Sequence, residues 1–403
     1  MDKSQLINDF ATLAIQSGGW MEMDRVYLQN QLADLLHETA FNRETLVKNI
    51  PSEASVLIEE LVKVACSNGA MTSSESLENY KTKLLDFLTP PPAVINAMFS
   101  QHFNDDPQVA LDYFYNICLQ NQQVRVPKTT RTENLTVPYP LNVKKIAMSS
   151  ITDVPFVEGH RYCPVCSANE GYINREQQVF DRNMRLIRMN LLGDSWFFRF
   201  NPISFQRQQG IFIPEKHEHL NRRQLLSRAI QLVDVFSSYM IGFIDNAHTA
   251  LEHSYLEGAN QLFPIESAKN INLFDIIIFP TVKGRLLNWN HSSVSLTSAQ
   301  PMDLLNAVDY FISKWISENN RDTPIAVAMR KNADLYTCYI IFMDYRLYET
   351  IGMIKQGFNQ TINCFDALGT YTLDDEADST TIIDVENPNH ISTGILETFI
   401  KTL

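Results

Sequence analysis

Long apolar runs are missing from this sequence of 403 residues. No stretch reaches the roughly 18 consecutive apolar residues by which a membrane-spanning helix is recognised. The N-terminal segment MDKSQLINDFATLAIQ also lacks the basic region followed by an apolar region that marks a secretory signal. We therefore expect a cytoplasmic protein with no membrane partner.

Basic residues are in the minority. Lysine and arginine together number 33, against 46 aspartate and glutamate residues, which gives a net charge of -13 at pH 7. A surplus of negative charge opposes broad binding to the phosphates of nucleic acids and to anionic membranes. We therefore expect no nucleic-acid partner, although a local basic pocket remains compatible with this balance.

Cysteine is scarce as well, with 6 residues in the chain. That number is too small for a scaffold held by disulfides, and only Cys163 and Cys166 lie close together in sequence. What the chain does have is an ordinary hydrophobic content of 45%, which is enough for a substantial core and for two or three packed units.

The first part of the chain is predicted to be helical. Segments such as ESLENYKTKLLDFL and DPQVALDYFYNICLQ carry apolar residues at steps of three and four, and three consecutive prolines at 90–92 separate two helices. The next segment, RVPKTTRTENLTVPYPLNV, is rich in Thr, Pro and Val and predicts an extended or irregular connection. We place a domain boundary there, so that residues 1–125 form a helical N-terminal region.

Strands and helices alternate in the remainder. SWFFRF and GIFIPE predict strands, NRRQLLSRAIQLVDVFSSYM predicts a helix whose apolar face includes Phe236 and Met240, and DIIIFPTV predicts a further buried strand. A second set follows, with a helix in PMDLLNAVDYFISKWISEN and a hairpin in IAVAMRKNADLYTCYIIFMD. These patterns predict an α+β fold with two similar halves, which we assign to residues 126–290 and 291–403.

Cys163 and Cys166 form a CxxC motif, whose spacing lets two thiolates reach one tetrahedral metal ion. Alone, this motif is compatible with a metal site, a redox pair or no function at all. The chain has no second CxxC, so a zinc ion would need histidine or carboxylate ligands as well. The candidate histidines are His217, His219, His248 and His253. A single histidine is more often an ordinary surface or core residue, and spacing does not choose among the four.

Several segments follow one another in a recognisable order: DRVYLQNQL, PAVIN, LDYFYN, YCPVCSANEGY, RNMRLI, SWFFRFNP, and LEHSYLEG followed by FP. Together they resemble the class II galactose-1-phosphate uridylyltransferases, the branch found mainly in Gram-positive bacteria. The resemblance covers most of the chain, and YCPVCSANEGY followed by WFF is its most specific part.

The resemblance implies a fold and a reaction. Members of that family have two histidine-triad-like α+β halves, which in class II are preceded by a helical N-terminal region. They exchange UDP-glucose and galactose 1-phosphate for glucose 1-phosphate and UDP-galactose through a uridylylated histidine. A UDP-sugar or a hexose 1-phosphate is therefore the expected small-molecule partner, and a homodimer is an expected assembly because dimers are common in the family.

The resemblance also implies a metal site. The zinc ligands of the wider family, where metal is bound, correspond to Cys163, Cys166, His217 and His253. All four residue types are present, which selects His217 over His219 and His253 over His248. On this basis we expect a structural zinc ion.

The catalytic segment departs from the family. A class II pattern resembling SHDHFQGG aligns with EHSYLEGA, so that Tyr255 stands in place of the nucleophilic histidine and Glu257 in place of a phosphate-facing glutamine. Asn183 and Arg185 keep part of a pattern NHR and are, with Glu257, the expected substrate-binding residues. A histidine-rich family segment finds only MIKQGFNQTIN at 353–363, which contains no histidine.

These departures oppose efficient transfer of UMP. A neutral imidazole can attack phosphorus at pH 7, whereas a tyrosine with an ordinary pKa near 10 is ionised in about one molecule in 1000, a handicap of about 4 kcal/mol. A carboxylate at position 257 would also face a diphosphate, and one contact between like charges about 4 Å apart costs on the order of 1 to 4 kcal/mol.

Two functions follow from this balance. By family the chain is a uridylyltransferase of galactose metabolism, with Tyr255 at the position of the catalytic nucleophile. Alternatively, it is an inactive member that keeps the fold and the zinc ion and acts as a sugar-nucleotide-binding, protein-interaction or regulatory module. A weaker third hypothesis is a different transferase or hydrolase that uses His217, His219 or His248.

Overall fold

The computed structural model describes residues 2–44, 54–71, 77–136, 139–147, 163, 165–174, 179–245, 253–319, 324–343, 364–376, 379 and 393–403. The chain forms two compact units. The first comprises Met1–Arg125, Pro155–Met189 and Phe197–Pro202. The second comprises Val126–Val154, Asn190–Trp196 and Ile203–Leu403. No helix in the described part of the chain is both long enough and apolar enough to cross a membrane.

The first unit contains the predicted helical N-terminal region. Its helices are α1 (Lys3–Gln16), α2 (Arg25–Leu35), α3 (Ala54–Ser67), α4 (Leu77–Phe87), α5 (Pro92–Asp105) and α6 (Pro107–Gln120). The first four share a core of buried side chains that includes Phe10, Leu32, Leu61 and Leu84. The unit also holds a small hairpin of β3 (Ile173–Asn174) and β4 (Val179–Phe180).

Proline and aspartate set the boundaries between the later helices. The segment of three prolines separates α4 from α5, as the sequence predicts, because consecutive prolines cannot continue a helix. Asp106 caps α6 through its side chain, which accepts a hydrogen bond from the Gln108 amide at 2.7 Å, and Pro107 occupies the first helical position.

The largest sheet has ten strands in the order β10-β11-β12-β14-β13-β8-β9-β7-β6-β5. Its strands are β5 (Ile187–Leu191), β6 (Asp194–Phe200), β7 (Gly210–Pro214), β8 (Met240–Asp245), β9 (Leu256–Ala259), β10 (Asn270–Asp275), β11 (Lys283–Leu287), β12 (Ser293–Ser298), β13 (Ile325–Asn332) and β14 (Leu335–Phe342). Helix α7 (Arg222–Val235) lies between β7 and β8 in the sequence, and α8 (Pro301–Asn319) lies between β12 and β13.

The sheet repeats one pattern twice. Three strands, one helix and two strands follow each other from β5 to β9, and the same sequence of elements returns from β10 to β14. The two sets lie next to each other in the sheet, and each has the same order of strands when it is counted from its own edge towards the middle. The structure therefore confirms the predicted α+β class and its two similar halves after a helical region.

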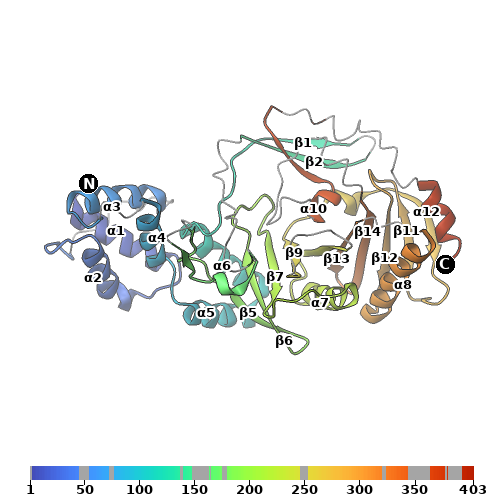
Figure 1. The fold of residues 1–403 in the computed structure, drawn as a ribbon, viewed down its shortest axis with the longest axis horizontal. Helices are drawn as coiled ribbons and strands as arrows, with labels where there is room; N and C mark the ends of the chain where they lie inside the picture. Colours follow the sequence, from blue (N-terminus) through green and yellow to red (C-terminus); the bar gives the residue numbers. More distant parts are fainter. Residues whose placement is uncertain are drawn as a thin grey trace. The chain divides into compact units, whose positions relative to one another are not determined.

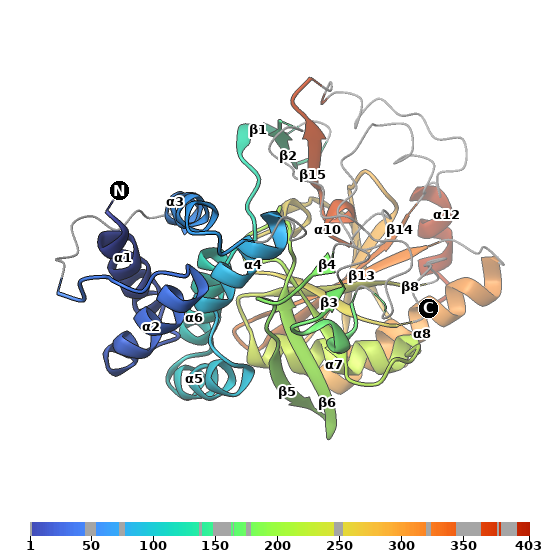
Figure 2. The same cartoon turned by 60° about the vertical axis from the view of Figure 1, so that its left-hand side comes forward.

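Both faces of the central strands are covered within the second unit. Helices α7 and α8 contact each other and pack on one face of the sheet (Figure 1). On the other face lie the short helix α10 (Cys364–Ala367) and a sheet of β1 (Thr129–Leu135), β2 (Leu141–Ile146) and β15 (Thr370–Asp374), which lie side by side in Figure 2. Helix α12 (Thr393–Ile400) is the last helix of the described chain.

Two predicted elements differ from the structure. The helix predicted through Met240 stops at Val235, because Ser237 and Ser238 form a turn, and Met240 begins β8 instead. The prediction of a buried strand in DIIIFPTV is wrong. Strand β10 ends at Asp275, and the chain then makes successive turns. Reversal into the antiparallel strand β11 requires those turns, and Pro280 cannot donate a hydrogen bond to a strand ladder.

Candidate metal centre and the residues around Tyr255

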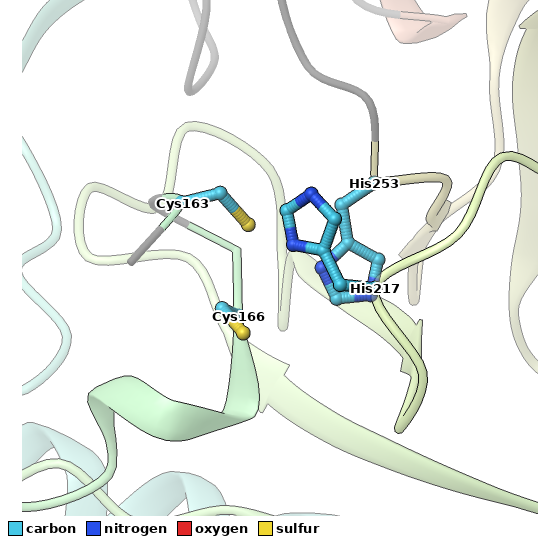
Figure 3. Close-up of side chains that lie close together, drawn as sticks. All are labelled: Cys163, Cys166, His217 and His253. Carbon is cyan, nitrogen blue, oxygen red and sulfur yellow. The ribbon is translucent and has the colours of Figure 1, made fainter. Parts of the chain in front are cut away.

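Four side chains gather at a candidate metal centre. The ligand atoms of Cys163, Cys166, His217 and His253 all lie within 4.8 Å of one another. In Figure 3 the two thiols face the two imidazole rings. These are the four residues expected from the resemblance, whereas His219 is exposed and outside the group, and His248 lies outside the described residues.

Local hydrogen bonds shape this cluster. The Cys166 amide donates to the carbonyl of Cys163 at 3.0 Å, which closes the CxxC turn, and the Asn169 side chain donates to the same carbonyl at 2.8 Å. His217 follows β7, and His253 precedes β9, which pairs with β7 in the sheet. The pairing of two neighbouring strands thus places the two histidines side by side, with ring centroids 4.7 Å apart.

The donor set fits a tetrahedral divalent ion. Two sulfur and two nitrogen ligands are a common combination at structural zinc sites, where the ligand atoms lie about 3.3 to 3.8 Å apart when metal distances are about 2.0 to 2.3 Å. A maximum separation of 4.8 Å in the protein is therefore only slightly wider than a loaded site requires. Burial and the neighbouring Cys166 thiol raise the pKa of Cys163 to about 11, so a bound cation would have to displace its proton.

His253 is prepared to act as a ligand. Its side chain is almost fully buried, and Nε2 lies 3.0 Å from the carbonyl oxygen of Pro214. A neutral ring that donates from Nε2 to this carbonyl keeps a lone pair on Nδ1. Burial lowers the pKa of His253, which favours the neutral ring that metal binding needs.

Arg199 is a charged neighbour of the two cysteines. Burial lowers the pKa of its guanidinium to about 10, against the opposing influence of Asp181, Cys163 and Cys166. It therefore remains a cation at neutral pH. Its Nη1 also donates to the sulfur of Met184 at 2.9 Å. The sequence gave no signal for Arg199, because nothing in the spacing connects it to the CxxC motif.

Tyr255 directly precedes β9 and is partly buried, and Glu257 is buried within that strand. Burial and the charge of Glu257 raise the pKa of Tyr255 well above its ordinary value. Burial raises the pKa of Glu257 to about 7, only partly offset by a hydrogen bond from the main chain. At neutral pH Tyr255 is therefore a neutral phenol and Glu257 is near the midpoint of its titration, so the pair offers no strong nucleophile.

Helix α10 fills the space beside Glu257. The amide of Cys364 donates to Oε2 of Glu257 at 2.9 Å, and the Cys364 thiol lies 3.6 Å from the carbonyl of Val327. The helix also sits tightly on β8: a Cβ added to Gly242 would lie 2.5 Å from the sulfur of Cys364. The sequence gave no signal for this contact, because 107 residues separate the two partners.

Arg185 uses all of its donors inside the first unit. Its five N–H groups have five acceptors, four main-chain carbonyls and one carboxylate. These acceptors belong to Asp86, Thr89, Pro90, Arg182 and Met184. Asn183 donates to the carbonyl of Asn121, and Asn121 donates back to the carbonyl of Asn183. Substrate binding by Arg185 and Asn183 stays a prediction, and it would require these contacts to be exchanged.

Comparison with known proteins identifies the relatives. A sequence profile described as galactose-1-phosphate uridyl transferase, N-terminal domain, matches residues 19–141. The galactose-1-phosphate uridylyltransferase of Enterococcus faecalis is 26% identical over 350 residues, which cover 81% of this chain and 68% of the relative. Over most of its length the chain is thus similar to galactose-1-phosphate uridylyltransferases.

Further relatives carry the same name. A Streptococcus pneumoniae protein named galactose-1-phosphate uridylyltransferase 2 is 27% identical and covers 77% of this chain, and a Staphylococcus saprophyticus relative is 28% identical. The chain spans about two thirds of the length of these relatives. Among solved structures, yeast Ap4A phosphorylase Apa2 with AMP superposes with a TM-score of 0.42 and 10% identity, covering 71% of this chain and 90% of that chain.

Proposed function

We propose that this chain is a uridylyltransferase-family protein that does not transfer UMP and that acts as a regulatory or protein-interaction module in galactose metabolism. The observation that carries the proposal is the state of Tyr255. The residue at the position of the family nucleophile is a partly buried phenol with a raised pKa, beside a second acidic group. Desolvation and the nearby Glu257 oppose ionisation of this phenol, so attack on phosphorus is strongly disfavoured.

The surroundings of Glu257 support the same proposal. In a transferase this position should face a phosphate, but here its carboxyl accepts a hydrogen bond from the chain's own Cys364 amide. The buried side chains of α10 complete a hydrophobic cluster with β8, β13 and the loop after β9. In this cluster the rings of Phe365 and Phe263 are stacked, with their centroids 5.1 Å apart. A substrate that approached Glu257 would have to displace this packing.

A zinc ion is part of the proposal. Cys163, Cys166, His217 and His253 would hold it, and its charge would replace the protons of the two thiols and fix the loops that carry the ligands. We assign the ion a structural role because four protein ligands leave no open position for a substrate or a water molecule.

The second candidate is the family reaction itself, with UDP-glucose and galactose 1-phosphate as substrates. Membership in the family favours it, since relatives with 26% to 28% identity carry the name galactose-1-phosphate uridylyltransferase. In that case Tyr255 or another group would have to replace the histidine that the family uses.

One assay separates the two candidates. Purified protein is incubated with UDP-glucose and galactose 1-phosphate, and the formation of UDP-galactose is followed beside a Tyr255→His, Glu257→Gln variant. We expect no turnover by the unmodified protein, and activity in the variant alone would agree with this. Robust turnover by the unmodified protein would overturn the proposal.

A further inference from the structure

Polar side chains form a band across four neighbouring strands of the second half. Strands β11, β12, β14 and β13 lie next to one another in the large sheet (Figure 1). Residues that lie opposite each other in an antiparallel pair have their side chains on the same face. The register therefore places on one face a set that we call the polar band, namely Arg285, Ser295, Thr297, Arg330, Thr337 and Tyr339. It is the face that carries α10, because Tyr339 packs in the same buried cluster as Phe365.

Arg285 keeps donors that the described part of the chain does not use. Its Nε donates to Oγ of Ser295 at 3.0 Å, and its side chain is half-buried. Both Nη atoms lack a hydrogen-bond or ion-pair partner among the described residues. The second arginine of the band differs, because Nε of Arg330 lies 2.9 Å from an oxygen of Glu266 and both of its Nη atoms donate to main-chain carbonyls. Arg285 is therefore the arginine of the band that can take an anion.

Tyr339 supplies a neutral donor near this cation. Burial raises the pKa of Tyr339 to about 12, although the charges of Arg285 and Arg330 oppose this shift, so the phenol is protonated at neutral pH. The side chain is 5% exposed, and within the described ranges its hydroxyl has no hydrogen-bond partner. A buried hydroxyl without a partner costs free energy, and a bound acceptor removes that cost. The half-buried hydroxyls of Thr297 and Thr337, 3.3 Å apart, extend the band along the same strands.

The charge of the band favours an anion. The whole chain carries a net charge of -13, yet the band contains two arginines and no carboxylate. Glu266 compensates the charge of Arg330. On β11, Lys283 is compensated in the same way by Asp275, at 3.0 Å. In the part of the chain that the structure describes, the charge of Arg285 is left without a carboxylate, so an anion can bind there without displacing a partner.

A phosphate group matches this set of donors. The planar guanidinium of arginine binds two oxygens of a phosphate at once, which a lysine ammonium cannot do. A phosphate presents a further oxygen to a third donor, and Tyr339 offers one. A carboxylate has two oxygens, both of which Arg285 would take, so the phenol would stay without a partner.

The band has a counterpart in the first half. Strand β9 lies between β7 and β8, and β14 lies in the same way between β12 and β13. Glu257 of β9 lies opposite Gly242 of β8. Across β13, the same face continues through Ala328 to Tyr339 of β14. In the first half this place is acidic and accepts a hydrogen bond from α10, whereas in the second half it is basic and keeps unused donors. The second half is thus the part of the sheet that suits an anion.

We propose that the polar band binds a phosphate group, with the Nη atoms of Arg285 on two oxygens and the hydroxyl of Tyr339 on a third. The site goes beyond the function proposed above, and it does not depend on whether the chain transfers UMP. The same donors recognise inorganic phosphate and the phosphate of a small phosphomonoester, and the binding experiment separates these two sources.

Binding is measured by isothermal titration calorimetry of the full chain in a buffer free of phosphate, with inorganic phosphate and glycerol 3-phosphate as separate probes. We expect one site per chain. Tighter binding of glycerol 3-phosphate assigns the site to phosphomonoesters, and tighter binding of inorganic phosphate assigns it to the free anion. Absence of binding of both probes would overturn the proposal.

Two variants test whether the bound phosphate lies on the polar band. Arg285→Gln should weaken binding at least about tenfold, because it removes hydrogen bonds from a charged donor. Tyr339→Phe should weaken binding about two- to tenfold through the loss of one neutral hydrogen bond. It should not lower the unfolding temperature of the protein without probe, since no described residue accepts a hydrogen bond from this hydroxyl.

Arg223→Gln is the matched control. Arg223 is 54% exposed on α7, which packs on the opposite face of the sheet, and this variant should bind both probes like the unmodified protein. Equal affinities of Arg285→Gln and the unmodified protein would reject the site.

A chemical modification locates the site independently. Phenylglyoxal reacts with arginine side chains, and mass spectrometry of peptides shows which arginines are modified. A saturating concentration of the tighter probe should slow the modification of Arg285 and leave that of Arg223 unchanged. A protein that binds the probe but does not protect Arg285 would show that the phosphate lies elsewhere.

Discussion

At the residue scale, Arg185 and Glu257 were both expected to bind substrate, but their polar groups form hydrogen bonds within the protein. Arg185 donates all five of its N–H groups to acceptors in the protein, and a carboxyl oxygen of Glu257 accepts a hydrogen bond from the Cys364 amide in α10. Removing either side chain would leave buried polar groups without partners, which costs about 1 to 3 kcal/mol for each group. Loss of stability and loss of substrate binding must therefore be separated in any variant of these residues.

The pH dependence of the free energy of unfolding should reveal the raised pKa of Glu257. The pKa of this carboxyl is about 7 in the folded protein against 4.5 for an ordinary glutamate. Folding thus favours the protonated form, so the contribution to stability is fully present below pH 4.5 and is lost as the pH rises through 7. Glu257→Gln cannot ionise and keeps an oxygen for the Cys364 amide.

We therefore expect the free energy of unfolding of Glu257→Gln, relative to the unmodified protein, to rise by roughly 3 kcal/mol between pH 4.5 and pH 8. Urea unfolding at a series of pH values measures this difference. Glu376→Gln serves as a control, since Glu376 is exposed in the turn after β15. Parallel pH profiles for Glu257→Gln and the unmodified protein would contradict the prediction.

The metal ligands show what sequence could supply at this scale. The CxxC spacing indicated two of them, but four histidines remained as candidates until the resemblance selected His217 and His253. The structure brings those two to the cysteines, and metal binding stays a prediction. The acceptors of Arg185 could not be predicted, because Asp86, Thr89 and Pro90 lie more than 90 residues away in sequence and are joined to it only by folding.

At the scale of elements, periodicity predicted helices well where one face is buried. Helix α8 spans the predicted residues, and Leu304, Val308, Phe311 and Trp315, which recur at helical spacing, are all buried. The prediction of a buried strand in DIIIFPTV failed for a physical reason. An unbroken apolar run contains no periodicity, and here only Ile276 and Val282 of its aliphatic residues are buried.

Tight packing between α10 and β8 can be tested with one methyl group. A Cβ at position 242 would lie 2.5 Å from the sulfur of Cys364 and 2.8 Å from the carbonyl oxygen of Val327. Gly242→Ala should therefore lower the free energy of unfolding by about 1 to 3 kcal/mol, the usual cost of overpacking a core.

The double variant provides the control for that prediction. In a Cys364→Ala background the sulfur is gone and only the contact with Val327 remains, so Gly242→Ala should cost less than in the unmodified protein. The coupling is obtained from a double-mutant cycle measured by urea unfolding. An equal cost in both backgrounds would show that α10 does not press on β8 at this position.

At the scale of the whole molecule, the mirrored order of ten strands explains why an α+β fold with two halves was predictable. Each half repeats the same succession of strands and helix, and each succession leaves its own pattern in the sequence. The short helix α10 and strand β15 left no comparable pattern. Their contacts on the sheet follow from tertiary packing, which overrides the weak preferences of segments this short.

Loss of the metal ion should lower the stability of the whole protein. We expect about one zinc ion per chain in protein prepared without a chelator, and we expect Cys163→Ser to lose the ion and to unfold at a lower temperature. Cys66→Ser is the matched control, because Cys66 is exposed and outside the ligand cluster. A metal-free protein with an unchanged unfolding temperature would reject a structural zinc ion.

If the chain does not transfer UMP, as proposed above, the packing of α10 on the sheet is a second obstacle to activity besides the residues at 255 and 257. Histidine at 255 and glutamine at 257 would restore reactive groups, but Cys364 would still lie against position 257. Recovery of activity would then require a steric change as well as a chemical one. Two requirements of different kinds are rarely met by a single substitution, so activity would have to come from changes at these positions and in α10 together.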